Sequence, residues 1–170
     1  MTKENTMQPF ERGDVFIGLT ELNDPDDDHA GRGRIQQFGS NLQLKGELWT
    51  DGGAHLVGGL EFDNDGVLWA FNDLAVIHVD PQNGRQRPLS DQILPRVYRS
   101  ASFRADGHVF LGEHMKAKEK PTTGMATRTT IKFPVLPGEG VLGFGFIYEY
   151  DADWNLVNVF ESETAPELTG

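Results

Sequence analysis

Short runs of apolar residues, several of them alternating with polar ones, fill the stretch from residue 58 to residue 84, and turn residues separate the runs. We expect three strands here, over residues 59–62, 67–71 and 74–79. Asp65-Gly66 and Asn83-Gly84 allow the left-handed backbone that tight reversals need, and Pro81 presets φ at the second reversal. The pattern therefore predicts three antiparallel strands, which make up most of one β-propeller blade.

The same frame recurs along the chain. Residues 100–112 align with residues 59–71, which places Asp106-Gly107 over Asp65-Gly66, and a partial copy begins at Gly13. A hairpin predicted over residues 34–48 likewise matches one over residues 146–160. Internal repeats of roughly 40 to 50 residues with four short strands each are typical of a β-propeller. An irregular antiparallel sandwich with unrelated Asp-Gly turns is the alternative.

We therefore expect an all-β fold of about three four-stranded antiparallel blades, half of a six-bladed propeller. One domain should span residues 1–170, with blades at about residues 7–50, 56–90 and 97–162. In the first blade, residues 7–10 are predicted to form the innermost strand and residues 13–20 the second. The third blade contains a long inserted loop at residues 113–144.

One motif carries a resemblance to known propellers. Residues 58–69 read Gly-Gly-Leu-Glu-Phe-Asp-Asn-Asp-Gly-Val-Leu-Trp, and residues 77–84 read Ile-His-Val-Asp-Pro-Gln-Asn-Gly. This pattern resembles blades of the NHL and senescence-marker-protein/gluconolactonase-like propellers and is similar to virginiamycin B lyase repeats. The resemblance covers nearly the whole chain, in three copies. It implies an architecture but not a function, because enzymes and binding modules share such blades.

The number of blades raises the question of how the fold is closed. A propeller normally closes with about six or seven blades of this kind, whereas this chain of 170 residues contains three. An arc of three blades would leave two apolar flanks open to water. We expect a homodimer that places two arcs head to tail, or a partner chain that supplies the missing blades. A truncated sequence is a further alternative.

Charge and composition exclude several classes of partner. The formal net charge of −11 argues against binding to nucleic acid, whose phosphates require clustered Lys and Arg. The basic cluster Lys116, Lys118 and Lys120 is best explained as a solvated loop tip. The chain has no cysteine, which excludes disulfides, cysteine-bound metals and thiol nucleophiles. No apolar run could span a bilayer or act as a signal peptide, so we expect no membrane contact and a cytoplasmic location.

The lengths of the turns predict where function is carried. The turns after first and third strands are short, at residues 63–66, 80–84, 105–107 and 151–155. Both long insertions and both connectors between blades fall at the opposite end of the blades. Loops on a rigid scaffold concentrate binding and catalysis, so we expect the functional surface at the looped end. A purely packing role for the long loops is the alternative.

An acidic loop contains the candidate metal ligands Asp24, Asp26 and Asp28. Closely spaced carboxylates suit a hard cation, and the spacing imitates the first half of a calcium-binding loop. However, His29 and Ile35 stand where that loop requires Gly and a bidentate Glu. The alternative is a solvated acidic loop. A divalent cation, calcium or zinc, is the cofactor candidate that the sequence offers.

The candidate catalytic residues are His55, Glu113 and His114. His55 precedes an innermost strand, so it would lie near the mouth of a central channel and act as a general base or ligand. Glu113 and His114 form a metal-like pair, although adjacent residues of a strand point to opposite faces. The candidate ligand-binding residues are Arg96, Tyr98, Arg99, Glu61, Asn72 and Asp73. Capping of strands and packing of loops are the alternative roles for these connector residues.

Two functions from different classes remain. The first is a non-catalytic propeller module that self-associates and binds a partner or small ligand on its looped face. The alternative is a metal-assisted lactonase or lyase of the gluconolactonase-like kind, with its site at the channel mouth. That resemblance implies an Asn or Asp ligand where the innermost strands begin, but Gly58 and Arg99 occupy these positions. The N-terminal Glu ligand of that family also lacks a clear counterpart, because Glu11 precedes a different sequence.

Overall fold

The computed structural model describes residues 4–21, 31–54, 57–72, 75–88, 98–113 and 146–161. All regular elements in these ranges are β-strands, which confirms the predicted all-β class. The described residues contain no helix with the length and apolar character needed to cross a membrane.

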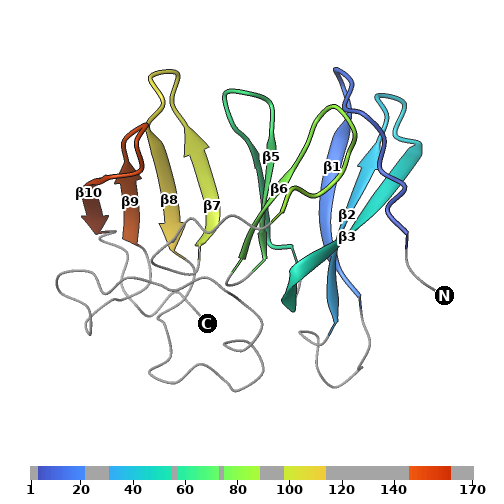
Figure 1. The fold of residues 1–170 in the computed structure, drawn as a ribbon, viewed down its shortest axis with the longest axis horizontal. Coiled ribbons are helices and arrows are strands. Elements are labelled where there is room, and N and C mark those ends of the chain that lie inside the picture. The colour runs from blue at the N-terminus through green and yellow to red at the C-terminus, as the bar shows by residue number, and fades with distance from the viewer. Residues whose placement is uncertain are drawn as a thin grey trace.

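Three small antiparallel sheets stand in an open row (Figure 1). The N-terminal sheet contains β1 (Val15–Thr20), β2 (Arg32–Phe38) and β3 (Leu44–Ala54). The middle sheet contains β4 (Gly59–Phe62), β5 (Leu68–Asn72) and β6 (Ala75–Val79). The C-terminal sheet contains β7 (Tyr98–Phe103), β8 (Val109–Glu113), β9 (Phe146–Tyr150) and β10 (Leu156–Glu161). Only the last sheet therefore shows the four strands expected of each repeat, and the row does not close into a ring within the described ranges.

The turns of the repeats share their backbone conformation. Gly66 and Gly107 have φ angles of 76° and 89°, and in both turns the glycine N–H donates to the carbonyl three residues earlier. Gly13, at the same place before β1, has a φ of 96°. Leu42 and Trp154 occupy matching positions in two other turns, with φ angles of 60° and 63°. The alignment of the repeats in the sequence is therefore matched by the backbone.

The middle sheet is buried on both sides, and β5 shows why its sequence lacks polar residues. Leu68 and Ala70 pack toward the N-terminal sheet, together with Ile77 and Val79. Trp69 and Phe71 point the other way and pack against the C-terminal sheet. Successive side chains of a strand alternate between its two faces, so a strand between two sheets must be apolar at every position.

The strand predicted at residues 7–10 does not lie innermost in the first repeat. At one end of β1 the Val57 N–H donates to the Leu19 carbonyl, and at the other end Phe16 contacts Phe62. β1 therefore runs antiparallel to β4, as expected if β1 is the second strand of its repeat. β4 and β7, in contrast, end side by side, because Asn64 Nδ2 donates to the Arg104 carbonyl. No described residue occupies the innermost place beside β1.

Residues 5–10 instead lie along the outer strand β3 and across to the middle sheet. The Thr6 and Met7 N–H groups donate to the Glu47 carbonyl, and the Phe10 N–H donates to the Pro81 carbonyl. Met7 is buried in the core between the first two sheets. An apolar segment that contains Met7 and Phe10 could form an inner strand or fill the space between the two sheets. The pattern of apolar residues in the sequence does not distinguish these two positions.

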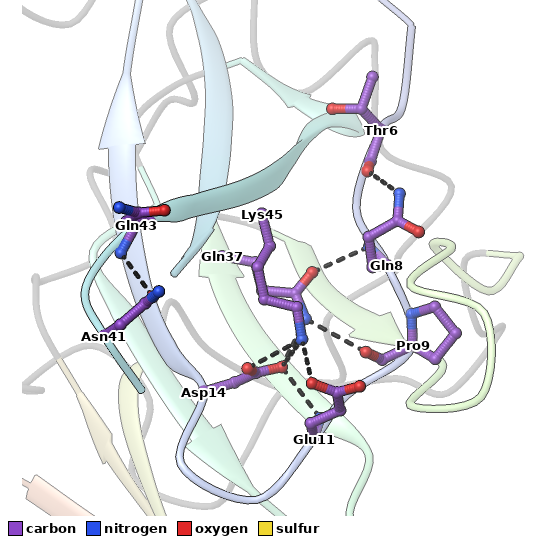
Figure 2. A network of polar contacts seen from close by, with 9 residues as sticks. All are labelled: Thr6, Gln8, Pro9, Glu11, Asp14, Gln37, Asn41, Gln43 and Lys45. Atoms are coloured by element: carbon purple, nitrogen blue, oxygen red, sulfur yellow. Dashed lines mark hydrogen bonds and ion pairs between the residues drawn. The ribbon is translucent and has the colours of Figure 1, made fainter. Parts of the chain in front are cut away.

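A polar network holds this N-terminal segment to the sheet (Figure 2). Gln37 is fully buried; its side chain accepts from the Gln8 N–H and donates to the Pro9 carbonyl and to Asp14 Oδ2, over 2.9, 3.3 and 2.7 Å. Lys45 Nζ lies 3.0 Å from both carboxylate oxygens of Asp14 and from Glu11 Oε2. These contacts join β1, β2 and β3 to the segment that crosses their edge.

Replacing Gly46 by alanine should detach this segment. A Cβ at Gly46 would lie 2.2 Å from the Thr6 carbonyl oxygen, which is backbone and cannot swing aside. We expect a loss of about 2 kcal/mol in the free energy of unfolding, measured by urea denaturation, and faster proteolysis within residues 4–10. Gly66→Ala is the matched control because its φ is strained but its surroundings are open, so about 1 kcal/mol is expected there. Unchanged proteolysis in Gly46→Ala would contradict the assignment.

The short turns lie where the sequence placed them. Residues 63–66, 80–84, 104–107 and 151–154 all lie at the same end of the strands, the upper end in Figure 1. The strand ends that lead into the long connectors lie at the opposite, lower end. The inserted loop predicted at residues 113–144 lies outside the described residues after Glu113.

Candidate functional site: two uncovered sheet faces

No other described sheet packs against the outer face of the N-terminal sheet. Its side chains alternate with the buried Ile35 and Leu48, which point toward the middle sheet. Strand register aligns Val15 with Phe38, Ile17 with Gln36, and Arg34 with Trp49. We call this surface the leading face, and it consists of Val15, Ile17, Arg34, Gln36, Phe38, Glu47 and Trp49.

An arginine and a tryptophan form the centre of the leading face. The Arg34 guanidinium lies 5.0 Å from the centre of the Trp49 ring, a cation–π contact. Glu47 fixes the pair, because it accepts from Trp49 Nε1 over 3.0 Å and lies 3.5 Å from the Arg34 guanidinium. The Arg34 Nε atom is buried and has no acceptor among the described residues. Arginine and tryptophan are the residues most enriched at the energetic centres of protein interfaces.

The C-terminal sheet presents the second uncovered surface. Strand register places Ser102 and Glu149 on either side of Phe110, and Ile147 opposite Phe160. We call this surface the trailing face, and it consists of Ser100, Ser102, His108, Phe110, Ile147, Glu149 and Phe160. Glu149 is buried there, with its carboxylate 2.8 Å from His108 Nδ1 and 3.6 Å from the Arg104 guanidinium. The face thus combines an apolar part with one acidic group.

Positions that match one another in the three repeats differ sharply in exposure. Counting from the left-handed glycine of each turn, Val15 and Ile17 match Leu68 and Ala70 of the middle sheet and Val109 and Leu111 of the C-terminal sheet. The latter four are 1%, 0%, 4% and 0% exposed, because each pair packs against the preceding sheet. Val15 and Ile17 are 40% and 42% exposed, since no described sheet precedes theirs. Val15 and Ile17 on the leading face therefore match residues of a buried interface, but no described sheet packs against them.

A polar position also recurs in the three repeats, at Gln37, His78 and Glu149. Gln37 pairs with Asp14 in the first sheet, and Glu149 pairs with His108 at the matching places of the third. In the middle sheet, Trp69 lies 4.2 Å from the His78 ring, and His78 Nε2 is buried without a described partner. Burial lowers the pKa of His78, because the charged imidazolium would lose its hydration there.

Five of the predicted site residues lie on described strands. Tyr98 and Glu113 are register partners between β7 and β8, so the structure brings these two backbones together. Arg99 follows on β7, and Asn72 ends β5. Glu61 lies on β4, beside β7, and its carboxylate accepts from the neighbouring Phe62 N–H over 3.2 Å. These five residues are therefore spread over β4, β5, β7 and β8.

The other predicted site residues lie outside the described residues. They are Asp24, Asp26, Asp28, His55, Asp73, Arg96 and His114. Within the described ranges, no group of three or more His, Asp or Glu side chains is arranged so that it could hold a metal ion. The metal and catalytic assignments therefore stay predictions.

The residues that form the two faces were not predicted from the sequence. The open flanks were expected from the blade count, but alternation alone does not tell which apolar positions keep a partner. The usable signal was the match of Val15 and Ile17 to Leu68 and Ala70 in the aligned repeats. Exposed apolar positions on an end repeat are the ones that self-association would bury.

The chain was compared with known protein families and with curated proteins, and neither comparison found a match.

Proposed function

We propose that this protein is a non-catalytic β-propeller module that self-associates through its leading and trailing faces and binds a partner or small ligand at its looped end. Three arguments support the propeller arrangement. The three sheets stand side by side, β4 and β7 are adjacent as inner strands, and the short turns share one end. Two copies placed head to tail would bring six sheets together in one ring, with β1 near its centre.

The observation that carries the proposal is the exposure of Val15 and Ile17 at positions that the other repeats bury. Two exposed apolar residues on one face of a sheet favour packing against another sheet. The two ends of the row differ, since one is a leading and the other a trailing face. In the proposed association the leading face of each copy therefore packs against the trailing face of the other, and these two interfaces close the ring.

Binding is proposed in preference to catalysis because of the departures at the family's metal positions. Gly58 and Arg99 cannot replace the Asn or Asp ligands that the lactonase-like resemblance implies. The looped end offers connectors and insertions on a rigid set of sheets, which is where binding surfaces occur. Such a surface needs no metal and no catalytic base.

The first test is the solution mass of the wild-type chain and of Ile17→Asp by light scattering. We expect twice the chain mass of 18.9 kDa for the wild type, and at least about tenfold weaker association for the variant, because a charge would be buried at the seam. The unfolding temperature of the Ile17→Asp monomer should be close to that of the wild-type monomer, since this side chain is already exposed in the single chain.

Val157→Asp is the matched control, because Val157 is an exposed apolar residue of β10 that has no partner in the register with β9 and is not among the residues of either face. Its mass should stay that of the wild type. A wild-type protein that remains a monomer at all concentrations would overturn the proposed self-association.

A further inference from the structure

We infer that the seam between two copies is formed by Phe110 of one copy packing against Leu42 and Val15 of the other. This inference rests on the proposed self-association and goes further, because it states which residues meet. Its template is the interface between the middle and C-terminal sheets, which the chain makes with itself.

In that internal interface, one aromatic residue of β5 is received by two rings of the following sheet. Trp69 stacks on Trp154 with the ring centres 5.4 Å apart and the planes at 12°, and it meets Phe103 edge-on at 4.9 Å. Val109 and Leu111 complete the receiving surface. Phe16 repeats the pattern one sheet earlier, since it meets Phe62 edge-on at 5.6 Å.

The two uncovered faces carry the two halves of the same arrangement. Phe110 holds the position of Trp69 in the C-terminal sheet, and its ring contact among the described residues is Phe160 of its own sheet, at 6.3 Å. Leu42 holds the position of Trp154 and shares its left-handed backbone. Leu42 is 70% exposed, which is unusual for a leucine whose counterpart covers a core tryptophan. Val15 holds the position in the N-terminal sheet that Val109 holds in the C-terminal sheet.

A second copy of the chain is the occupant that fits both faces. The seam continues the series of sheet-to-sheet interfaces already present in the chain, with Phe110 replacing Trp69 and Leu42 replacing Trp154. The two faces also carry opposite charges, since the trailing face contains the Glu149 carboxylate and the leading face contains the Arg34 guanidinium. A foreign partner would need to reproduce one face, whereas a second copy supplies both.

The absence of cysteine permits a direct test by cross-linking. Leu42→Cys and Phe110→Cys are made as two separate proteins, mixed, and treated with a short bismaleimide. We expect a covalent dimer in the mixture, identified by mass spectrometry as residue 42 joined to residue 110. Neither protein alone should cross-link. A mixture of Phe110→Cys with Val157→Cys is the control and should stay monomeric on a denaturing gel.

Leu42→Trp gives an independent measurement that needs no cysteine. Tryptophan is the residue at the matching position of the C-terminal sheet, so the seam should gain aromatic contact and association should tighten at least about threefold. Leu42→Asp should weaken association at least about tenfold.

The outcomes separate this inference from the proposed function. A dimeric wild type without the cross-link between residues 42 and 110, or a cross-link formed by either variant alone, would overturn the seam while leaving self-association in place. A monomeric wild type would overturn the proposed self-association and the seam together. A cross-linked mixture with the expected Leu42→Trp effect would support the seam.

Discussion

Replacing Trp69 by alanine is expected to lower the free energy of unfolding by about 4 kcal/mol. Trp69 is 6% exposed and its ring is in contact with four aromatic side chains, those of Phe71, His78, Phe103 and Trp154. Its Nε1–H donates to Asp63 Oδ2 over 2.9 Å, so the indole also fixes the turn between β4 and β5. Removing the ring would leave a cavity in the core between the middle and C-terminal sheets, and would leave the Asp63 carboxylate without this donor.

Urea unfolding followed by far-ultraviolet circular dichroism measures the effect without relying on tryptophan fluorescence. Trp69→Phe should cost about 1 kcal/mol, because phenylalanine stands at the matching Phe110 and only the hydrogen bond and some packing are lost. Trp154→Ala should cost less than Trp69→Ala, since Trp154 is only half-buried and sits in a left-handed turn. Equal losses for Trp69→Ala and Trp154→Ala would contradict a core centred on Trp69.

The second large effect is expected at Asp14, where alanine should cost about 3 kcal/mol. The side chain of Asp14 is 3% exposed. It accepts hydrogen bonds from the Glu11 N–H, from Gln37 Nε2 and from Lys45 Nζ. Alanine would leave the buried Gln37 amide with one acceptor fewer and would remove the anchor that joins β1 to β2 and β3. Asp14→Asn keeps the shape and loses the charge, so it should cost about half as much.

The pH dependence of stability tests the same network. Burial by itself would raise the pKa of Asp14, but hydrogen bonds from the Glu11 N–H, Lys45 and Gln37 outweigh it and hold the pKa below its ordinary value. The folded pKa therefore lies below the unfolded one, so this stabilisation is present above about pH 4 and is lost as the pH falls through the folded pKa. Hydrogen bonds to Asp14 and Glu11 raise the pKa of Lys45, so its contribution is present below about pH 10 and is lost above that value.

Urea unfolding of the wild type, Asp14→Asn and Asp14→Ala at a series of pH values checks both signs. The wild type should lose stability below about pH 4, and part of that slope should disappear in both variants. Asp151, whose pKa is lowered by hydrogen bonds from Asn155, supplies acid-dependent stability that both variants retain. Parallel pH profiles for all three proteins would show that Asp14 is not the group that titrates.

The internal core and the seam between copies should respond to different substitutions. Trp69→Ala acts on the interface between two sheets of one chain, so it should lower the unfolding free energy of the monomer. Ile17→Asp acts on a side chain that the monomer leaves exposed, so it should change the association and leave the unfolding of the monomer nearly unchanged. A variant that changes both equally would mean that the chain folds only when it associates.

The all-β class, most of the strands and the short turns follow from local sequence. Asp65-Gly66 and Asp106-Gly107 specify reversals through backbone conformations that few residues other than glycine adopt, and the strands between them alternate or run apolar. The burial of β5 on both sides was also readable, because Leu68, Trp69, Ala70 and Phe71 leave no polar face. These features depend on residues close together in the chain, which is why the sequence alone determined them.

The place of residues 5–10, the pairing of Asp14 with Lys45 and Gln37, and the uncovered state of Val15 and Ile17 were decided only by the tertiary structure. Met7 and Phe10 are apolar whether they form an inner strand or fill the space between the first two sheets. The Thr6 backbone can lie against β3 because Gly46 has no side chain there. Val15 and Leu68 look alike in sequence, and what separates them is whether another sheet lies against them. Such differences arise from contacts between distant segments, which alternation along the chain does not encode.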